Sequence, residues 1–168
     1  HNKQRIQNSS RKNWYDLRTL IDKRGRAEIL IPRLIYRNYA VYWNQALYVP
    51  GELFIEFVPH EKIDPRVYLA ILNSTLIEVL FRCHAQVYGG GTYNMNSGEI
   101  KKLPIIDASC LHEEQREMLI QAYEDFTSDP DLNRNPIDTA IGCVLELSPD
   151  MIERIEETKQ DLIEIATA

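Results

Sequence analysis

The fold is decided by residues 64–105, which begin DPRVYLAILNSTLIEVLFR, continue through GGG at 89–91 and end in IKKLPI. Apolar residues recur at helical spacing on both sides of Asn73 and Ser74, so the sequence predicts two short helices that meet there. The glycines end the second helical pattern, and a short apolar strand that ends at a proline follows them. We expect a helical support that holds a flexible polar loop, residues 92–96, against a sheet.

Both expected helices carry start signals. Asp64 before Pro65 is typical of a helix start, because the carboxylate caps the first turn and proline needs no amide hydrogen there. Thr75 and Glu78 have the spacing of a capping box at the start of the second helix. Core packing is the simplest explanation of the apolar stripes, so this stretch is expected to support a site rather than to catalyse.

Length and composition indicate a globular protein. With 168 residues, 44% of them hydrophobic, the chain is long enough for one domain, or for one domain with a helical appendage. The first thirteen residues are polar and basic and the apolar runs are short, so we expect no signal peptide, no membrane span and a cytoplasmic location. The three cysteines match no metal-ligand spacing, which favours reduced intracellular thiols. The chain starts at His1 rather than at a methionine, which suggests a piece of a longer protein.

The formal net charge of -6 hides an asymmetry. Residues 1–105 carry 15 Lys and Arg against 9 Asp and Glu, whereas residues 106–168 carry 4 against 16. This distribution indicates two surfaces with different partners. The basic residues of the first part could either bind phosphates or only keep the surface solvated, and the sequence does not decide between the two. For the acidic residues of the second part, surface solvation is the simpler explanation.

The remaining patterns predict an α+β fold, with a mixed β-sheet and packed helices followed by a C-terminal acidic helical segment. A hairpin turn is expected at Asn44 and Gln45. We expect strands at 28–31 (ended by Pro32), 34–43, 46–49, 53–58 and 103–106, and helices at 111–126, at 137–147 and from Ser148 onward. We divide the chain into a linker at 1–13, a domain at 14–106 and a C-terminal helical segment at 107–168.

Five features in one order resemble a known family. They are WYDLR at 14–18, an isoleucine-rich strand with proline at 29–32, YLAILNS at 68–74, the glycine run before Tyr93, and IKKLPI at 100–105. In this order they resemble the C-terminal specificity domain of adenine-specific DNA methyltransferases, a class that includes fused restriction–modification enzymes. They are also similar to the target recognition domains of type I restriction specificity subunits. The resemblance covers residues 14–105 and leaves out the acidic helical tail.

The resemblance implies a DNA-binding specificity module whose parent protein transfers a methyl group from S-adenosylmethionine to adenine in a specific site. The catalytic motifs are missing here, because NPID at 135–138 has only the first two residues of the Asn-Pro-Pro-Tyr type of motif that holds a flipped adenine. We interpret NPID as a turn before a helix, and we expect no catalytic residue and no cofactor in this chain. The expected partners are double-stranded DNA and a methyltransferase catalytic domain in the same or another chain. The acidic tail could dock on that catalytic domain or on a partner subunit. Whether the parent also cleaves DNA stays open.

A metal-dependent nuclease is the rival chemistry. Glu99 and Lys101 have the Glu-x-Lys spacing of such enzymes, in which carboxylates hold the ion. The nearest candidate for a partner carboxylate, Asp64, is expected to be committed to a helix cap. The histidines, at 1, 60, 84 and 112, have no spacing suited to zinc or to a catalytic triad, so no metal site is expected.

The candidate site residues fall into three groups. The residues expected to contact phosphates are Lys23, Arg24, Arg26, Arg33 and Arg37. The residues expected to read base edges are Tyr93, Asn94 and Asn96, because an amide matches adenine in the major groove. Gly89, Gly90 and Gly91 would let the backbone approach the duplex closely. Two alternatives stay open, namely ordinary turn chemistry for the asparagines and a protein-interaction scaffold that uses the basic face against a neighbouring subunit.

Overall fold

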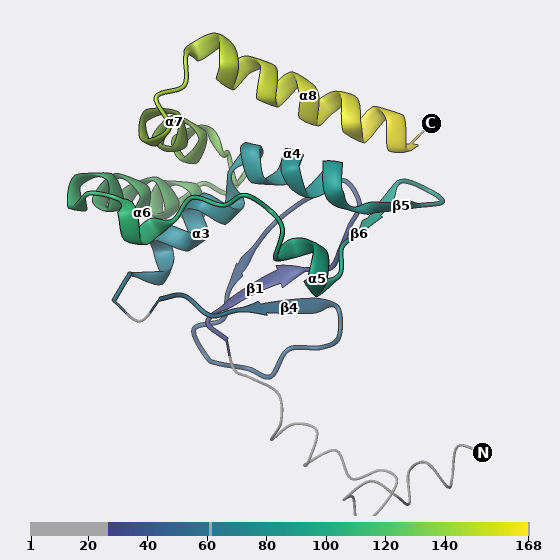
Figure 1. The fold of residues 1–168 in the computed structure, drawn as a ribbon, viewed down its shortest axis with the longest axis horizontal. Helices are drawn as coiled ribbons and strands as arrows, with labels where there is room; N and C mark the ends of the chain where they lie inside the picture. Colours follow the sequence, from purple (N-terminus) through teal and green to yellow (C-terminus); the bar gives the residue numbers. More distant parts are fainter. Residues whose placement is uncertain (1–26, 61, 168) are drawn as a thin grey trace, which may run out of the picture.

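The structure is a computed structural model, and it describes residues 27–60 and 62–167 (Figure 1). Sheet A contains β1 (Ile29–Pro32), β3 (Tyr42–Trp43) and β4 (Phe54–Phe57) in the order β3-β1-β4. Sheet B contains β2 (Leu34–Ile35), β5 (Gln86–Tyr88) and β6 (Thr92–Asn94) in the order β2-β6-β5. The helices are α3 (Pro65–Asn73), α4 (Thr75–His84), α5 (Ser97–Ile100), the short 3-10 helix η1 (Ala108–Cys110), α6 (Glu113–Ser128), α7 (Asn135–Val144) and α8 (Pro149–Thr167).

The α+β fold class is confirmed, but the described strands form two antiparallel sheets rather than one mixed sheet. The single strand expected at 34–43 is wrong. Its ends belong to different sheets, as β2 and β3, and the segment between them turns its carbonyl groups toward arginine side chains. The first strand ends at Pro32 as expected, with Pro32 included as its last residue, opposite Phe54 at the end of the ladder.

Two other expected strands are also wrong. Residues 46–49 are not a strand, because the Asn44 side chain holds the turn: its Nδ2 donates to the carbonyl of Tyr48 and its Oδ1 accepts from the Tyr48 amide. Leu47 has a φ of 51°, which interrupts extended structure. Residues 103–106 follow the short helix α5 and are not a strand either. Leu103 instead turns inward, its amide donating to the carbonyl of Ile100.

The predicted helix pair is confirmed as α3 and α4, with one correction to its caps. Asp64 caps α3 through its Oδ1, which accepts from the Arg66 amide at 2.8 Å. The cap of α4 is Ser74 rather than Thr75, since the Ser74 side chain accepts from the amide of Ile77. Glu78 does not complete a capping box, because it is buried in an ion pair with Arg82.

Asn73, at the junction of the two helices, ties them to the strands. It is fully buried, and its amide exchanges two hydrogen bonds with the backbone of Val41, at 2.9 and 3.1 Å. The side chain therefore acts as a strand partner for the chain just before β3. The Asn73 amide can be buried at the helix junction of Leu-Asn-Ser because these hydrogen bonds satisfy it.

The C-terminal helices share one core with the strands and with α3. Ile29, Leu69, Phe81, Leu119 and Ile137 are all fully buried in a single cluster. The NPID segment forms the first turn of α7 rather than a turn before it. In Figure 1, α6 and α7 lie beside α3, and α8 runs across α4 toward the β5–β6 hairpin.

Among the described residues, no single helix has the length and apolar character needed to cross a membrane; the pair α3 and α4, bent by 64°, meets that requirement only when both are taken together.

Candidate nucleic-acid interface

One face of sheet B is turned outward. Residues that pair directly across strands share a face, so Gln86 lies with Asn94, and Tyr88 lies with Thr92. Leu34 of β2 pairs with Asn94 and lies on the same face. Gln86, Tyr88 and Leu34 are exposed, and the other two are half-buried. We call these five residues the outer face of sheet B.

The outer face carries a row of neutral polar groups. Nδ2 of Asn94 donates to the hydroxyl oxygen of Tyr88 at 3.3 Å, and that hydroxyl donates to Oε1 of Gln86 at 3.5 Å. Amide side chains both donate and accept hydrogen bonds, and a tyrosine hydroxyl does the same. The row can therefore match a partner surface that presents donors and acceptors side by side.

Tyr93 lies on the opposite, inner face of sheet B. Its side chain is 2% exposed, and its hydroxyl donates to the carbonyl of Leu162 in α8 at 2.5 Å. The guanidinium of Arg82 lies 4.9 Å from the centre of its ring. Residues 92–94 are therefore a strand rather than the expected loop, and strand alternation turns Tyr93 away from the face where Asn94 lies. Tyr93 was expected to read base edges, but it lies on the inner face and cannot reach them from there.

The glycine run forms the β5–β6 hairpin turn. Gly90 and Gly91 have φ values of 82° and 76°, a conformation that favours glycine. A Cβ added at Gly89 or Gly90 would meet no described atom within 4 Å, so these two positions are open to an approaching molecule. Gly91 is buried, and a Cβ there would lie 2.9 Å from the carbonyl oxygen of Ala166. The closest approach at Gly91 is therefore to α8, and the Tyr36 ring follows, with Cε2 at 3.2 Å from the added Cβ.

The side chain of Asn96 caps helix α5. Its Oδ1 accepts from the amides of Gly98 and Glu99, and Oε2 of Glu99 accepts from the Asn96 amide at 3.0 Å. This reciprocal capping box at the start of α5 is the turn chemistry left open by the sequence. The capping box also includes Glu99, the carboxylate of the nuclease alternative, which lies in a helix and accepts a hydrogen bond there.

Asp64, the other candidate carboxylate, is engaged as well. A hydrogen bond from the Arg66 side chain lowers the pKa of Asp64, and a second from the Arg66 amide acts in the same direction against partial burial. Among residues 27–60 and 62–167, no group of three or more His, Cys, Asp or Glu side chains is placed to hold a metal ion. The geometry therefore gives the nuclease alternative no support.

The predicted phosphate-contacting residues are placed differently from one another. Arg37 is exposed, with its guanidinium 5.5 Å from the centre of the Tyr36 ring. Arg33 is half-buried: its Nη1 donates to the carbonyl of Glu52 at 3.4 Å, and its buried Nε has no hydrogen-bond partner among the described residues. Arg37 is thus the freer of the two to meet a phosphate. Lys23, Arg24 and Arg26 lie outside the described residues.

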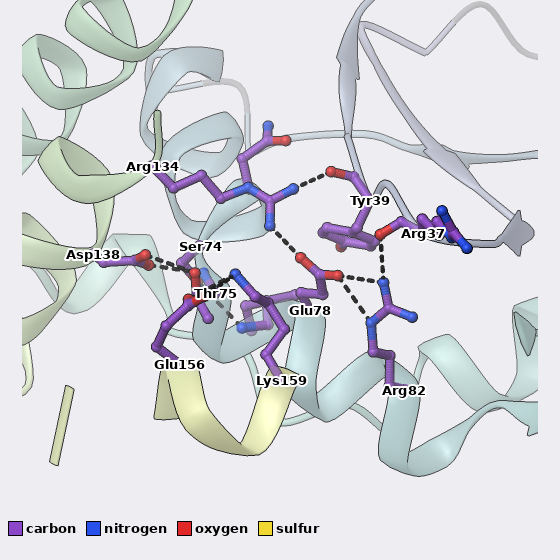
Figure 2. A network of polar contacts seen from close by, with 12 residues as sticks. Arg37, Tyr39, Ser74, Thr75, Glu78, Arg82, Arg134, Asp138, Glu156 and Lys159 are labelled. Carbon is purple, nitrogen blue, oxygen red and sulfur yellow. Dashed lines mark hydrogen bonds and ion pairs between the residues drawn. The ribbon is translucent and has the colours of Figure 1, made fainter. Parts of the chain in front are cut away.

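A buried ion network supports the segment that carries Arg37 (Figure 2). Glu78 accepts from Arg82 through one carboxylate oxygen and from Arg134, the residue just before α7, through the other. Arg82 then donates to the carbonyls of Tyr36 and Arg37 at 3.1 and 3.0 Å. Glu78 and Arg82 are each only 2% exposed, so both charges depend on these partners.

The same network reaches Tyr39 and α7. Arg134 donates to the Tyr39 carbonyl, and burial raises the pKa of the Tyr39 phenol well above its usual value. Asp138 of α7 accepts from the amide and the hydroxyl of Thr75 at 2.8 and 2.6 Å, which joins α7 to the start of α4. Burial raises the pKa of Asp138 despite these two hydrogen bonds. The 36–39 segment is therefore held by Arg82 of α4 and by Arg134, which precedes α7.

The comparison with protein families agrees with this architecture. The family model of the TaqI-like C-terminal specificity domain matches residues 1–105, which is more than half of the chain. This chain belongs to that family. Membership of the TaqI-like specificity domains makes it a DNA-recognition module of a methyltransferase-type restriction–modification protein. No curated protein and no solved structure matches the chain.

The specificity domain has surface residues that the sequence analysis missed. Gln86 and Tyr88 stand on the outer face beside Asn94 and were not among the expected site residues. Alternation on both sides of the glycine run, QVY before it and TYN after it, is a hairpin signal that could have identified them. The spacing of Asn96 and Glu99 could likewise have separated the capping asparagine from Asn94.

Proposed function

We propose that this chain reads DNA sequence for an adenine-specific DNA methyltransferase of a restriction–modification system, and that the outer face of sheet B makes the base contacts. The observation that carries the proposal is the direct pairing of Gln86 and Asn94 on that face. Asn and Gln form bidentate contacts with the adenine edge in the major groove, which is wide enough to admit a two-stranded β-ribbon. The hairpin of β5 and β6 is such a ribbon.

The neighbouring groups suit the same task. The hydroxyls of Tyr88 and Thr92 can contact base edges of either kind, and the exposed Leu34 is suited to a thymine methyl group. Arg37, exposed on the segment after β2, is suited to a phosphate contact that fixes orientation. Gly89 and Gly90 leave the hairpin tip free of side chains where the backbone would approach the duplex.

The chemistry belongs to the parent protein. In this proposal a catalytic domain, in the same chain or a partner chain, binds S-adenosylmethionine and methylates an adenine, while the residues of this chain select the site. The expected setting is the cytoplasm, where the DNA of such systems lies. The full-length protein should then transfer labelled methyl groups to adenine only in duplexes that this module selects.

Selection from a random duplex pool tests the base contacts. The intact protein is used to enrich sequences from the pool, and affinities are then measured for the preferred duplex and its single-base variants. Gln86→Ala and Asn94→Ala should each weaken the preferred duplex by about 5- to 150-fold, corresponding to about 1–3 kcal/mol per contact. The salt dependence should not change, because a neutral amide neutralises no phosphate.

Gln45→Ala is the matched control, since Gln45 is an exposed amide in the turn after β3. It should leave affinity and preference unchanged. If both outer-face variants keep the preference of the unmodified protein at every base position, the outer face of sheet B does not read bases. If the unmodified protein enriches no sequence, the protein-interaction alternative is favoured.

A further inference from the structure

Helix α8 lies beyond the residues that match the specificity-domain family, yet its last turns contact the hairpin that carries the outer face. Figure 1 shows the C-terminal end of α8 beside β5. Along its length α8 packs on α4, and no residue of α8 is fully buried. At its start, a Cβ on Gly142 of α7 would lie 2.5 Å from Cδ1 of Ile152, so the α7–α8 approach is close as well.

Two contacts join α8 to the hairpin. The first is the hydrogen bond from the Tyr93 hydroxyl to the carbonyl of Leu162. The second is the approach of Gly91, where a Cβ would lie 2.9 Å from the Ala166 carbonyl oxygen and 3.0 Å from Cγ2 of Thr167. Both contacts include a backbone carbonyl of α8, and the second also includes the Thr167 side chain, so they depend on where the end of the helix lies.

Tyr93 is held from two sides. The Arg82 guanidinium of α4 lies over its ring, and the Leu162 carbonyl of α8 accepts a hydrogen bond from its hydroxyl. Because Tyr93 and Asn94 are consecutive residues of one strand, a fixed position for Tyr93 fixes the position of Asn94 on the other face. The pairing of Asn94 with Gln86 and Leu34 then fixes the register of the whole outer face.

We propose that α8 is a positioning element for DNA recognition: it clamps the β5–β6 hairpin at Tyr93 and Gly91, and so holds the outer face of sheet B in the register that reads bases. Tyr93 and Gly91 are positioning residues that act through Asn94 and do not contact DNA. This inference rests on the proposed function. It adds a part of the chain outside the family match to the recognition machinery.

Glycine substitutions separate the clamp from backbone strain. Gly90 and Gly91 share the positive φ conformation, so alanine at either position carries the same kind of strain. Only at Gly91 does the new Cβ meet α8. In the intact protein without DNA, backbone amides of residues 86–94 should exchange hydrogen faster in Gly91→Ala than in Gly90→Ala. Gly91→Ala should also reduce the preference for the selected duplex over the random pool by about tenfold or more.

A hydroxyl deletion gives a gentler variant in case Gly91→Ala does not fold. Tyr93→Phe removes only the hydrogen bond to α8, and it should reduce the same preference by about 2- to 10-fold. Backbone amides of residues 86–94 should exchange hydrogen faster in this variant, while amides of α6 and α7 keep their rates. Tyr48→Phe is the matched control, because Tyr48 is 74% exposed and loses the same group.

The outcomes distinguish the clamp from the proposed function. Faster exchange in the hairpin together with relaxed preference supports the clamp. Unchanged preference in Tyr93→Phe overturns it, whether or not exchange changes. An unmodified protein that enriches no sequence overturns the proposed function, and the clamp's role in recognition with it.

Discussion

Sheet A and sheet B are each three-stranded and antiparallel, with an inner face on helices and a face turned outward, but their outer faces carry different chemistry. On sheet A the outer residues include Tyr42 and Phe54, whose rings meet edge to face at 6.0 Å. On sheet B the outer residues include Gln86 and Asn94, which flank a tyrosine hydroxyl. The two rings contact each other, whereas the amides keep hydrogen-bonding capacity for a partner, and this difference is why we propose that sheet B is the recognition surface.

The inner faces differ as well. Sheet A is held by apolar and aromatic packing, with Phe57 against Tyr68 at 5.3 Å and Trp43 against Tyr123 at 6.4 Å. Behind sheet B lies the buried network of Glu78, whose arginine partners bind backbone carbonyls. Burying an ion pair costs free energy of desolvation, but the pair makes directional contacts. Apolar packing has no such directionality. Sheet A therefore stabilises the fold, and the support of sheet B sets the position of particular backbone groups.

The largest expected effect comes from breaking the support of sheet B. Glu78→Ala leaves two arginines without their carboxylate, and the Arg82 side chain is fully buried. The free energy of unfolding should fall by about 3–5 kcal/mol, the usual result of removing one partner from a buried pair. Chemical denaturation measures it, and the control Glu153→Ala, at an exposed position on α8, should change it by less than about 0.5 kcal/mol. A loss below about 1 kcal/mol for Glu78→Ala would contradict this account of the network.

The next effect tests the two faces of sheet A against each other. Ile29→Ala empties a fully buried position on the inner face and should lower the free energy of unfolding by about 2–5 kcal/mol. Tyr42→Ala removes a side chain that is 52% exposed on the outer face, and it should cost only about 0.5–1.5 kcal/mol for the lost aromatic pair. Neither change should alter which DNA duplexes the protein prefers. Equal losses of stability would mean that the outer aromatics belong to the core.

Local patterns in the sequence predicted the helices well. Asp64 and Pro65 marked the start of α3, and the apolar spacing on both sides of Asn73 identified the helix pair. These signals depend on neighbours within one turn, so they need no knowledge of distant residues. The glycine run likewise marked the place of the turn between the two strands β5 and β6.

The contacts that decide the site are distant in the sequence. The expected strand at 34–43 breaks because Arg82 and Arg134, 45 and 95 residues from their carbonyl partners, take up backbone groups between its two ends. Tyr93 is turned inward by a helix that begins at Pro149, outside the stretch that carries the family resemblance. The chemistry of the side chains was thus enough to choose candidate residues. Which of them lie on the outer face and which on the inner face could be seen only in the tertiary fold.

The smallest effect concerns the ionic groups at the start of α3, which lie nearer to solvent than the network behind sheet B. Asp64 binds Arg66, which also pairs with Glu124 of α6, and the Asp64 and Arg66 side chains are about one-third exposed. Hydrogen bonding from Arg66 lowers the pKa of Asp64, so its charged form is stabilised in the folded protein. Such a group adds stability above its unfolded pKa of about 3.9, and this stability is lost as the pH falls through the lower folded value.

Asp64→Asn tests that contribution, because asparagine keeps the oxygen that caps the Arg66 amide but loses the charge and the second carboxylate oxygen, which accepts from Nη2 of Arg66. At pH 7 the variant should be less stable by about 0.2–1 kcal/mol, the usual size for a solvent-accessible ion pair. The difference should shrink below about pH 4 and vanish once Asp64 is protonated in both the folded and unfolded protein. Thermal or urea unfolding of both proteins from pH 7 to pH 2 measures it. A difference that stays constant with pH would show that asparagine fails as a cap, and that the Asp64 charge adds nothing to stability.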